Sequence, residues 1–461
     1  MKISKDMTKG SPLKTILLFS IPILLGNLLM QAYNLVDSIV VGHCVGTDAF
    51  GATSASNTLI NFFIAILIGL GSGASIIMSQ YFGRKNFDKL KQSFSTAMIA
   101  LITLTVLVSI LGIVFSRDIM IMLKVDVLIL DDACDYLRIF FYGLVPLMIY
   151  NMYSSFLRGI GNSKIPLVFL AIATLSNIVL DLFFVAYLNM GVRGVAIATV
   201  IANVISAILI MLYTNFRVEY FAIKKKSDIY FNMALLKKIA KAGFPVIFQS
   251  FLVSLSLLLL QAIFNSYGKD YTSAYGLSSR IDAIICLPLN SIATALATYV
   301  AQNKGAKENK RIVEGYWKSM LASCIITCVC SAIMMIYVEP VISIFIAQES
   351  METSALVIDV TKQFVYILGP CYFIMAIMFG TSNVLSGASD VKSPIIIMTV
   401  SMIIRTIIAF ALKAPLGYYA GIIAFPVSWT VGAILGVIRF KKGKWKNLSF
   451  MEDELLGEPI I

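Results

Sequence analysis

Twelve long apolar stretches constrain the fold more than any other feature of this chain. They lie at about residues 15–40, 52–80, 94–116, 139–157, 165–188, 194–213, 243–266, 272–302, 319–338, 363–385, 393–412 and 418–438. Each has at least 18 residues and almost no charge, which is typical of a transmembrane helix. Lipid gives backbone amides no partner, and the alternating pattern of a membrane β-barrel is absent. We therefore predict an all-α polytopic membrane protein with 12 transmembrane helices.

Composition supports this prediction and excludes other classes of protein. Hydrophobic residue types make up 59% of the chain and charged types 13%, whereas soluble domains average about 25% charged residues. The formal net charge of +12 does not indicate a nucleic-acid binder, because the basic clusters Arg84-Lys85, Lys224–Lys226 and Lys441-Lys442 flank the apolar stretches. There they would face anionic lipid. We expect the lipid bilayer as a partner and no nucleic acid.

The distribution of Lys and Arg predicts the orientation in the membrane. With a cytoplasmic N-terminus, the cytoplasmic segments hold 28 of the 37 basic residues and the outer segments hold 7. Acidic residues show no such bias, with 11 on each side. Because the excess of Lys and Arg faces the cytoplasm in membrane proteins, we expect a multi-pass protein of the plasma membrane with both termini cytoplasmic.

The two halves of the sequence resemble each other. Residues 46–48 and 80–85 are echoed 222 positions later by residues 268–270 and 302–307, and residues 159–166 are echoed 228 positions later by 387–394. Six spans in each copy give both copies the same orientation, so we predict a parallel internal repeat of two six-helix lobes. The predicted boundaries are an N-lobe at 1–214, a cytoplasmic linker at 215–235, a C-lobe at 236–440 and a cytoplasmic tail at 441–461. Paired lobes around a central site suit alternating access.

Several motifs together resemble the multidrug and toxin extrusion (MATE) family of transporters. The resemblance covers essentially the whole length and rests on Pro22 and Asp37, the turn Gly46–Ala49, the loop Gln80–Lys85, the segment RGIGNSKIP and the segment Asn177–Asp181. It implies secondary active export of cationic amphiphilic drugs by antiport with H⁺ or Na⁺. The acids of the N-lobe most resemble the prokaryotic DNA-damage-inducible and staphylococcal multidrug-efflux branch. The norfloxacin-exporter branch carries further acids in spans 7 and 10, which this chain lacks.

Two of the five charged residues within the predicted spans are candidates for ion coupling. Asp37 and Asp181 lie at similar depth in the outer half of spans 1 and 5, where ionisable groups are costly and usually functional. Two such carboxylates either share protons or hold a cation between them. Asn177 lies one helical turn before Asp181, and hard oxygen ligands suit Na⁺. The resemblance places Asp37, Asn177, Asp181 and Thr199 in a cation- or proton-binding site, where Na⁺ is the one metal ion we expect.

The repeat predicts that this site is asymmetric. In the second copy, the position equivalent to Asp37 holds Leu259 or Leu260. The position equivalent to Asp181 holds Ala409, and the position equivalent to Asn177 holds Arg405. The other intramembrane charges are Arg280, Asp282 and Arg405, which we group as a possible polar network of the C-lobe. Arg280 and Asp282 are two residues apart and do not face each other on a helix. Arg405 either pairs with Asp282 or serves to lock the C-lobe, and a structural role for all three residues is the alternative.

A substrate cavity is predicted from polar, aromatic and methionine side chains near the same spans. Methionine suits promiscuous apolar surfaces and aromatic faces attract organic cations. The candidates are Met30, Tyr33, Asn34, Asn151 and Asn203.

Catalytic motifs are absent from the sequence. It has one His and no Walker A motif, so we expect no enzyme activity, no cofactor and no direct use of ATP. We predict a monomeric exporter of small cationic drugs. The first alternative is a flippase for lipid-linked oligosaccharides of the same superfamily, which would need a strongly cationic cavity. The second is a membrane receptor or assembly factor without transport, against which the repeat and the buried acids argue.

Overall fold

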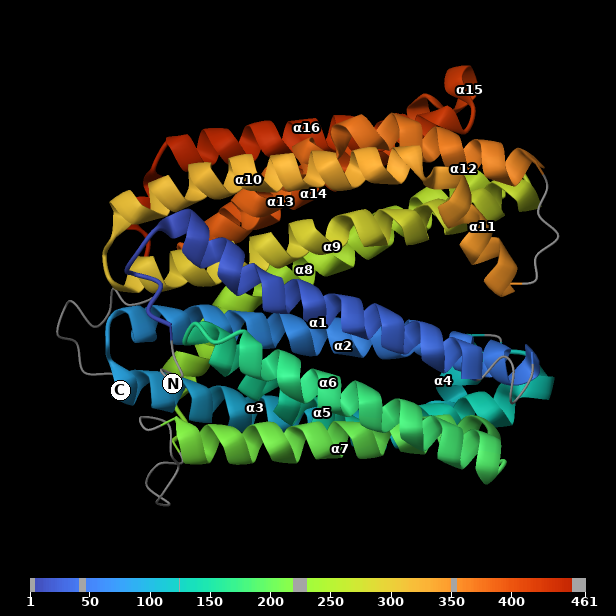
Figure 1. The fold of residues 1–461 in the computed structure, drawn as a ribbon, viewed down its shortest axis with the longest axis horizontal. Helices are drawn as coiled ribbons and strands as arrows, with labels where there is room; N and C mark the ends of the chain where they lie inside the picture. Colours follow the sequence, from blue (N-terminus) through green and yellow to red (C-terminus); the bar gives the residue numbers. More distant parts are fainter. Residues whose placement is uncertain (1–4, 41–46, 124, 219–229, 350–354, 450–461) are drawn as a thin grey trace. The chain divides into compact units, whose positions relative to one another are not determined.

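The computed structural model describes residues 5–40, 47–123, 125–218, 230–349 and 355–449. These residues form helices and no strands (Figure 1). Twelve helical segments among them are long and apolar enough to cross a membrane, by length and composition. The predicted all-α class and the 12 predicted spans are therefore confirmed.

The helices follow each other along the chain with short connections. They are α1 (Pro12–Val40), α2 (Thr47–Gly83), α3 (Phe87–Val114), α4 (Ser116–Met122), α5 (Val127–Gly159), α6 (Lys164–Asp181), the π-helix η2 (Leu182–Tyr187), α7 (Gly191–Arg217), α8 (Met233–Asn265), α9 (Lys269–Gly305), α10 (Asn309–Ile336), α11 (Val338–Glu349), α12 (Ala355–Leu368), the 3₁₀ turn η4 (Gly369–Cys371), α13 (Tyr372–Gly387), α14 (Lys392–Ala411), α15 (Lys413–Leu416), α16 (Tyr419–Lys441) and the 3₁₀ turn η5 (Lys444–Asn447).

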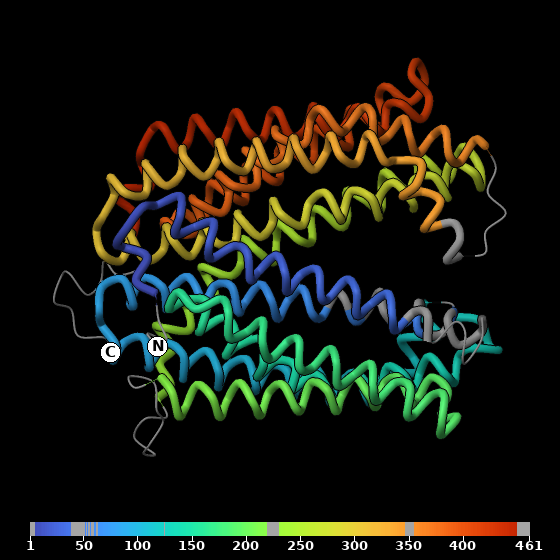
Figure 2. The backbone as a smooth tube through the Cα atoms, viewed as in Figure 1, coloured from blue at the N-terminus to red at the C-terminus, as the bar shows by residue number. Residues whose placement is uncertain are grey.

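The chain divides into two compact units. The first unit is built on Ile21–Ile247, and the second contains Thr8–Ser20 and the described residues from Phe248 to Ser449. In the first unit, α5 packs along α2, α3 and α7, which run beside it in Figure 2. In the second unit, α9 packs on α10 and α13, and α16 packs on α13 and α14 (Figure 1). The predicted lobe boundaries at 214 and 236 stay a prediction.

The helix bounds confirm the internal repeat. Helices α2 and α9 each have 37 residues and begin 222 positions apart, while α6 and α14, and likewise α7 and α16, begin 228 positions apart. The turns match as well. Lys85 and Lys307 have φ values of 60° and 61°, and Gly161 and Ser389 have 84° and 72°. Positive φ is uncommon for residues other than glycine, so these turns are specific features of both copies.

Several helices, α8 and α5 among them, begin well before the apolar stretches that predict them. Helix α8 begins at Met233 and α5 at Val127, whereas the corresponding stretches begin at about 243 and 139. The first three turns of α8 carry Lys237, Lys238 and Lys241. A helix keeps its own hydrogen bonds where it leaves the lipid, and long basic side chains reach water from it. Hydropathy therefore marks the membrane-crossing part of a helix rather than its ends.

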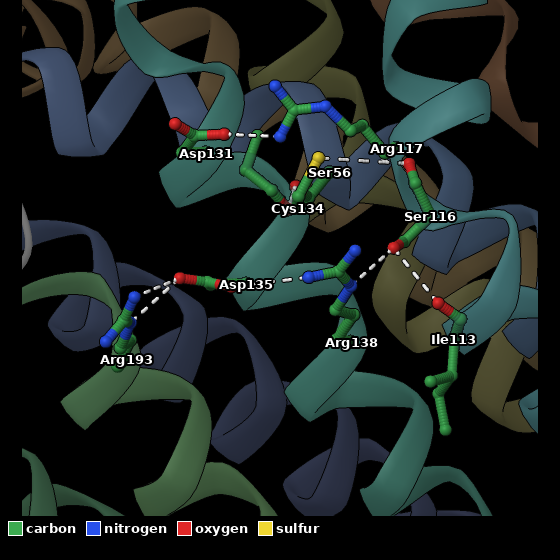
Figure 3. Close-up of polar contacts among 10 residues, drawn as sticks. Ser56, Ile113, Ser116, Arg117, Asp131, Cys134, Asp135, Arg138 and Arg193 are labelled. Atoms are coloured by element: carbon green, nitrogen blue, oxygen red, sulfur yellow. Dashed lines mark hydrogen bonds and ion pairs between the residues drawn. The ribbon is translucent and has the colours of Figure 1, made fainter.

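A network of charged side chains joins α4, α5 and α7 at one end of the first unit (Figure 3). Asp135 of α5 accepts a hydrogen bond from Nε of Arg193, at the start of α7, at 2.8 Å. Nε of Arg138 on α5 donates to Oγ of Ser116 on α4 at 2.7 Å, and Arg117 pairs with Asp131 at 2.7 Å. The network links the ends of α4, α5 and α7, and α7 also supplies Thr199 to the site described below.

A buried carboxylate organises the loop before α14 in the second unit. Asp390 is 1% exposed, and its Oδ1 accepts a hydrogen bond from the backbone N–H of Ser393 at 3.2 Å. Its Oδ2 accepts from Oγ of Ser393 and from Nε of Arg439, each at 2.8 Å. The side chain thus combines a helix cap with an ion pair to α16.

Replacing Asp390 by Ala should destabilise the second unit. The change removes the cap and leaves the Arg439 guanidinium, itself partly exposed, without its carboxylate. We expect the free energy of unfolding to fall by roughly 2–3 kcal/mol, below the full cost of breaking a buried pair because Arg439 reaches water. Urea unfolding of the purified protein in mild detergent measures this. The control is Glu314→Ala, which removes an exposed pair with Lys318 and should not shift the midpoint. Equal shifts for both variants would contradict the assignment.

Candidate functional site

Polar side chains from three helices of the first unit gather around two carboxylates. We call the set Tyr33, Asp37, Asn177, Asp181 and Thr199 the acid cluster. Helix α1 supplies the first two residues, α6 the next two and α7 the last. Tyr33 and Asp37 are four residues apart, as are Asn177 and Asp181, so each pair shares a helical face. The structure thus brings together all four residues of the predicted ion site.

Hydrogen bonds connect the members of the acid cluster across the helices. The hydroxyl groups of Tyr33 and Thr199 are 3.1 Å apart. Asn177, with its amide oriented to satisfy both ends, donates from Nδ2 to Oδ2 of Asp181 at 2.9 Å and accepts from the backbone N–H of Thr199 at 3.2 Å. The amide therefore joins the α6 carboxylate to α7 and fixes its orientation.

The two carboxylates are incompletely satisfied. Oδ1 of Asp37 and Oδ1 of Asp181 are buried and have no hydrogen-bond partner among the residues that the structure describes, and Asp181 is 0% exposed. The Asp37 charge acts on Asp181 by Coulomb repulsion. A buried carboxylate oxygen without a partner is costly, so each of these oxygens is suited to take a proton or a cation.

The chemistry of the donor set fits a small hard cation as well as a proton. Two carboxylates, an amide oxygen and hydroxyl oxygens of Tyr33 and Thr199 surround the same region, and Na⁺ prefers such ligands by analogy with other hard cations. Within the described ranges, no three His, Cys, Asp or Glu side chains come together as a metal site. The oxygen donors of the acid cluster are the kind that suits a small hard ion.

Two features of the acid cluster could not be found in the sequence. Tyr136 of α5 is 7% exposed and lies within electrostatic reach of Asp37, Tyr33 and Asp181. It lies 45 positions before Asp181 and 99 positions after Asp37 along the chain, on a helix that holds neither acid, so helix packing alone brings it there. The second feature is the π-helix η2, which begins directly after Asp181. Such π segments are rare and frequently mark functional sites.

The predicted substrate-cavity residues have different environments. Tyr33 belongs to the acid cluster, as its contact with Thr199 indicates. Met30 is 47% exposed and Asn34 is also exposed on α1. Asn151 is half-buried, and its Nδ2 donates to the backbone oxygen of Leu147 on its own helix. Asn203 is half-buried on α7, one turn beyond Thr199. Their role in substrate binding stays a prediction.

The second unit holds a separate polar network with new members. Arg405 of α14 is 3% exposed, and its Nε donates to Oγ of Ser428 on α16 at 3.1 Å. Oδ1 of Asp282 on α9 accepts from the hydroxyl group of Tyr372 on α13 at 2.7 Å. Among the described residues, Arg405 and Asp282 form no direct ion pair with each other; each has its own partner, Ser428 for Arg405 and Tyr372 for Asp282. Arg280 is exposed and lies 6.0 Å from the centre of the Phe345 ring, apart from Asp282 as predicted.

A family model, curated relatives and solved structures all match this chain. The MatE family model matches residues 22–183 and 245–411. The probable multidrug resistance protein YoeA of Bacillus subtilis is 30% identical over 83% of this chain and 84% of its own length, and the multidrug export protein MepA of Staphylococcus aureus is 27% identical over 64% and 66%. A crystal structure described as MATE in the bent conformation has the same fold, with a TM-score of 0.88 at 19% identity over 96% of this chain and 98% of its own. The duplicated six-helix architecture, the acid cluster and these matches lead to one conclusion: the chain belongs to the MATE family of membrane transporters.

Proposed function

We propose that this protein is a secondary active multidrug exporter that exchanges cationic amphiphilic compounds for H⁺ or Na⁺ at the acid cluster. Relatives named as multidrug resistance and multidrug export proteins support the efflux function. The family membership and the lack of a nucleotide-binding motif support ion coupling without a cofactor or a chemical reaction. We further propose that the protein acts as a monomer in the plasma membrane with both termini cytoplasmic.

The observation that carries the proposal is the pair of unpartnered carboxylate oxygens. Oδ1 of Asp37 and Oδ1 of Asp181 are buried in one cluster on different helices. Charge at this pair is expensive in lipid unless a proton or cation neutralises it. The occupancy of the pair therefore changes the free energy of any rearrangement that alters the packing of α1 against α6 and α7.

The coupling step follows from this dependence. An ion can shift a conformational equilibrium only by binding one state more tightly than the other. In the proposed cycle, an outward-open state takes up the ion at Asp37 and Asp181, and this weakens its hold on the drug. An inward-open state releases the ion and loads the next drug molecule. Met30, Asn34, Asn151 and Asn203 are the proposed residues of the drug cavity, with Tyr33 between the drug cavity and the acids.

Transport by the purified protein in proteoliposomes tests both the function and the ion. One sample of ethidium-loaded vesicles has a Na⁺ gradient at constant pH, and another has a pH gradient without Na⁺. In a parallel sample of each kind, the ion gradient is dissipated. We expect one imposed gradient to accelerate ethidium movement and its collapse to return the rate to that of protein-free vesicles. Rates that respond to neither gradient would refute ion-coupled export. Movement of a lipid-linked oligosaccharide in the same vesicles, without ethidium movement, would favour the flippase alternative.

A further inference from the structure

The repeat relates the acid cluster to a defined place in the second unit. Helices α6 and α14 begin at Lys164 and Lys392, so Asn177 and Arg405 are both the fourteenth residue of their helix. The helices that follow, α7 and α16, begin at Gly191 and Tyr419, again 228 positions apart. Asn177 contacts α7, and Arg405 contacts α16. The guanidinium of Arg405 thus stands at the position that corresponds to an amide of the acid cluster.

Arg405 is held firmly where it is. Its Nε donates to Oγ of Ser428, which in turn donates to the backbone oxygen of Phe425 at 2.7 Å. The guanidinium carbon lies 4.4 Å from the centre of the Phe425 ring, a distance at which the ring face attracts a cation. These contacts keep an almost fully buried charge in one orientation.

A carboxylate near Arg405 supplies the opposite charge. Asp282 is partly exposed and makes no direct ion pair with Arg405. Its partner Tyr372 packs against Trp429 with ring centres 5.5 Å apart, and Trp429 packs against Phe425, the ring under Arg405, at 5.8 Å. Oδ1 of Asp282 accepts from Tyr372, and its Oδ2 lies 3.8 Å from Sγ of Cys286. Asp282 lies on α9 and Tyr372 on α13, so two further helices direct polar groups to this region. The second unit therefore has one acid and a cation in place of two acids.

We propose that Arg405 is a tethered cation that occupies the second unit's counterpart of the ion site and permanently compensates Asp282. A guanidinium stays protonated in proteins and cannot leave its helix. The second unit consequently keeps a constant charge, while the acid cluster of the first unit exchanges its ion. This inference extends the proposed function, because it assigns ion exchange to one unit and a fixed counter-charge to the other.

The proposal predicts that truncating Arg405 exposes a cation-binding site lined by Asp282. We would compare the purified full chain with Arg405→Ala, with the double variant Arg405→Ala/Asp282→Asn and with Arg405→Lys. Guanidinium chloride at millimolar concentration is the probe, choline chloride is the salt control, and the melting temperature Tm is the readout. Arg405→Ala should melt below the wild type, and guanidinium should raise its Tm saturably by about 2–4 °C, as expected for a ligand that binds the folded state.

The other variants make the result specific. Guanidinium should not raise the Tm of the wild type, whose site is filled, or of the double variant, which lacks the acid. Arg405→Lys keeps a cation on the helix and should melt closer to the wild type than Arg405→Ala does. Lack of rescue in Arg405→Ala would overturn the proposal, and so would equal rescue in the double variant.

A transport measurement separates this inference from the proposed function. The double variant Arg405→Ala/Asp282→Asn keeps the summed charge of the pair at zero, so its ethidium transport should keep the ion dependence of the wild type. Loss of ion dependence in the folded double variant would place exchange in the second unit and contradict the tethered-cation proposal. Failure of Asp181→Asn to alter transport would instead refute the proposed function, and it would leave the guanidinium result unchanged.

Discussion

Cells that express Asp181→Asn should be as sensitive to ethidium as cells without the protein. The amide has the size of the carboxylate but cannot exchange a proton or hold a cation by charge. Asp181 is completely buried, its Oδ1 has no partner among the described residues, and it experiences repulsion from Asp37, so neutralising it should abolish the response of the cluster to its ion. Asp37→Asn should have the same effect, because it removes the second charge of the pair. Growth in graded ethidium, with membrane protein quantified, measures both variants.

The stability of Asp181→Asn distinguishes a functional loss from a folding defect. Removing a buried, incompletely paired charge is neutral or stabilising in most cases, so the purified variant should melt no lower than the wild type. Asp131→Asn is the matched control, since the Asp131 side chain is 81% exposed in its pair with Arg117 and exposed pairs contribute little. Ethidium resistance in Asp181→Asn equal to that of Asp131→Asn would show that the acid cluster does not couple transport.

Gly73→Ala should destabilise the first unit strongly. Gly69 and Gly73 of α2 form a GxxxG pattern that packs against Gly243 and Ile247 of α8. A Cβ atom at Gly73 would lie 2.4 Å from the backbone nitrogen of Gly243 and 2.5 Å from the backbone oxygen of Ile239. Because backbone atoms cannot rotate away, we expect a loss near the upper end of about 1–3 kcal/mol in the free energy of unfolding.

The control for Gly73→Ala is the same substitution at a glycine with free space around it. Gly276 of α9 has no atom within 4 Å of an added Cβ, so Gly276→Ala should be neutral or slightly stabilising through the better helix propensity of alanine. Urea unfolding in detergent and the yield of folded protein compare the two variants. Equal unfolding midpoints for Gly73→Ala and Gly276→Ala would contradict the close approach of the α2 and α8 backbones.

The membrane-spanning parts of the fold can be predicted from the sequence because the lipid imposes one strong rule. Twelve apolar stretches correspond to twelve spans, and the matching motifs correspond to matching helices and turns. The ends of α5 and α8 are missed because helices continue into water with charged residues. The interruption of the tenth span at Gly369–Cys371 is visible in the sequence only as a Gly-Pro pair, which helices in membranes often accommodate.

The sequence identifies those members of the candidate site whose burial in a membrane costs free energy. A carboxylate in an apolar stretch stands out, and helical spacing connects Asp181 with Asn177 and Asp37 with Tyr33. Tyr136 does not stand out, because tyrosine is common in such helices and its proximity depends on how α5 packs. The same holds for Tyr372 and Ser428 in the second unit. The sequence leaves open whether Arg405 pairs directly with Asp282, and helix packing instead gives them separate partners, Ser428 and Tyr372.

The π-helix beside Asp181 has an evolutionary consequence. Residues 182–187 of the first copy are wound as η2, while residues 410–415 of the second copy end α14 and begin the short helix α15. Nevertheless, the next long helices, α7 and α16, begin at equivalent positions. After duplication, this region of the two copies therefore diverged by substitution in place, without a net insertion or deletion. The first copy thus holds Asp181 and the second copy the buried Arg405 on matching helices, and the helices on either side of the altered segment, α6 with α7 and α14 with α16, begin at equivalent positions.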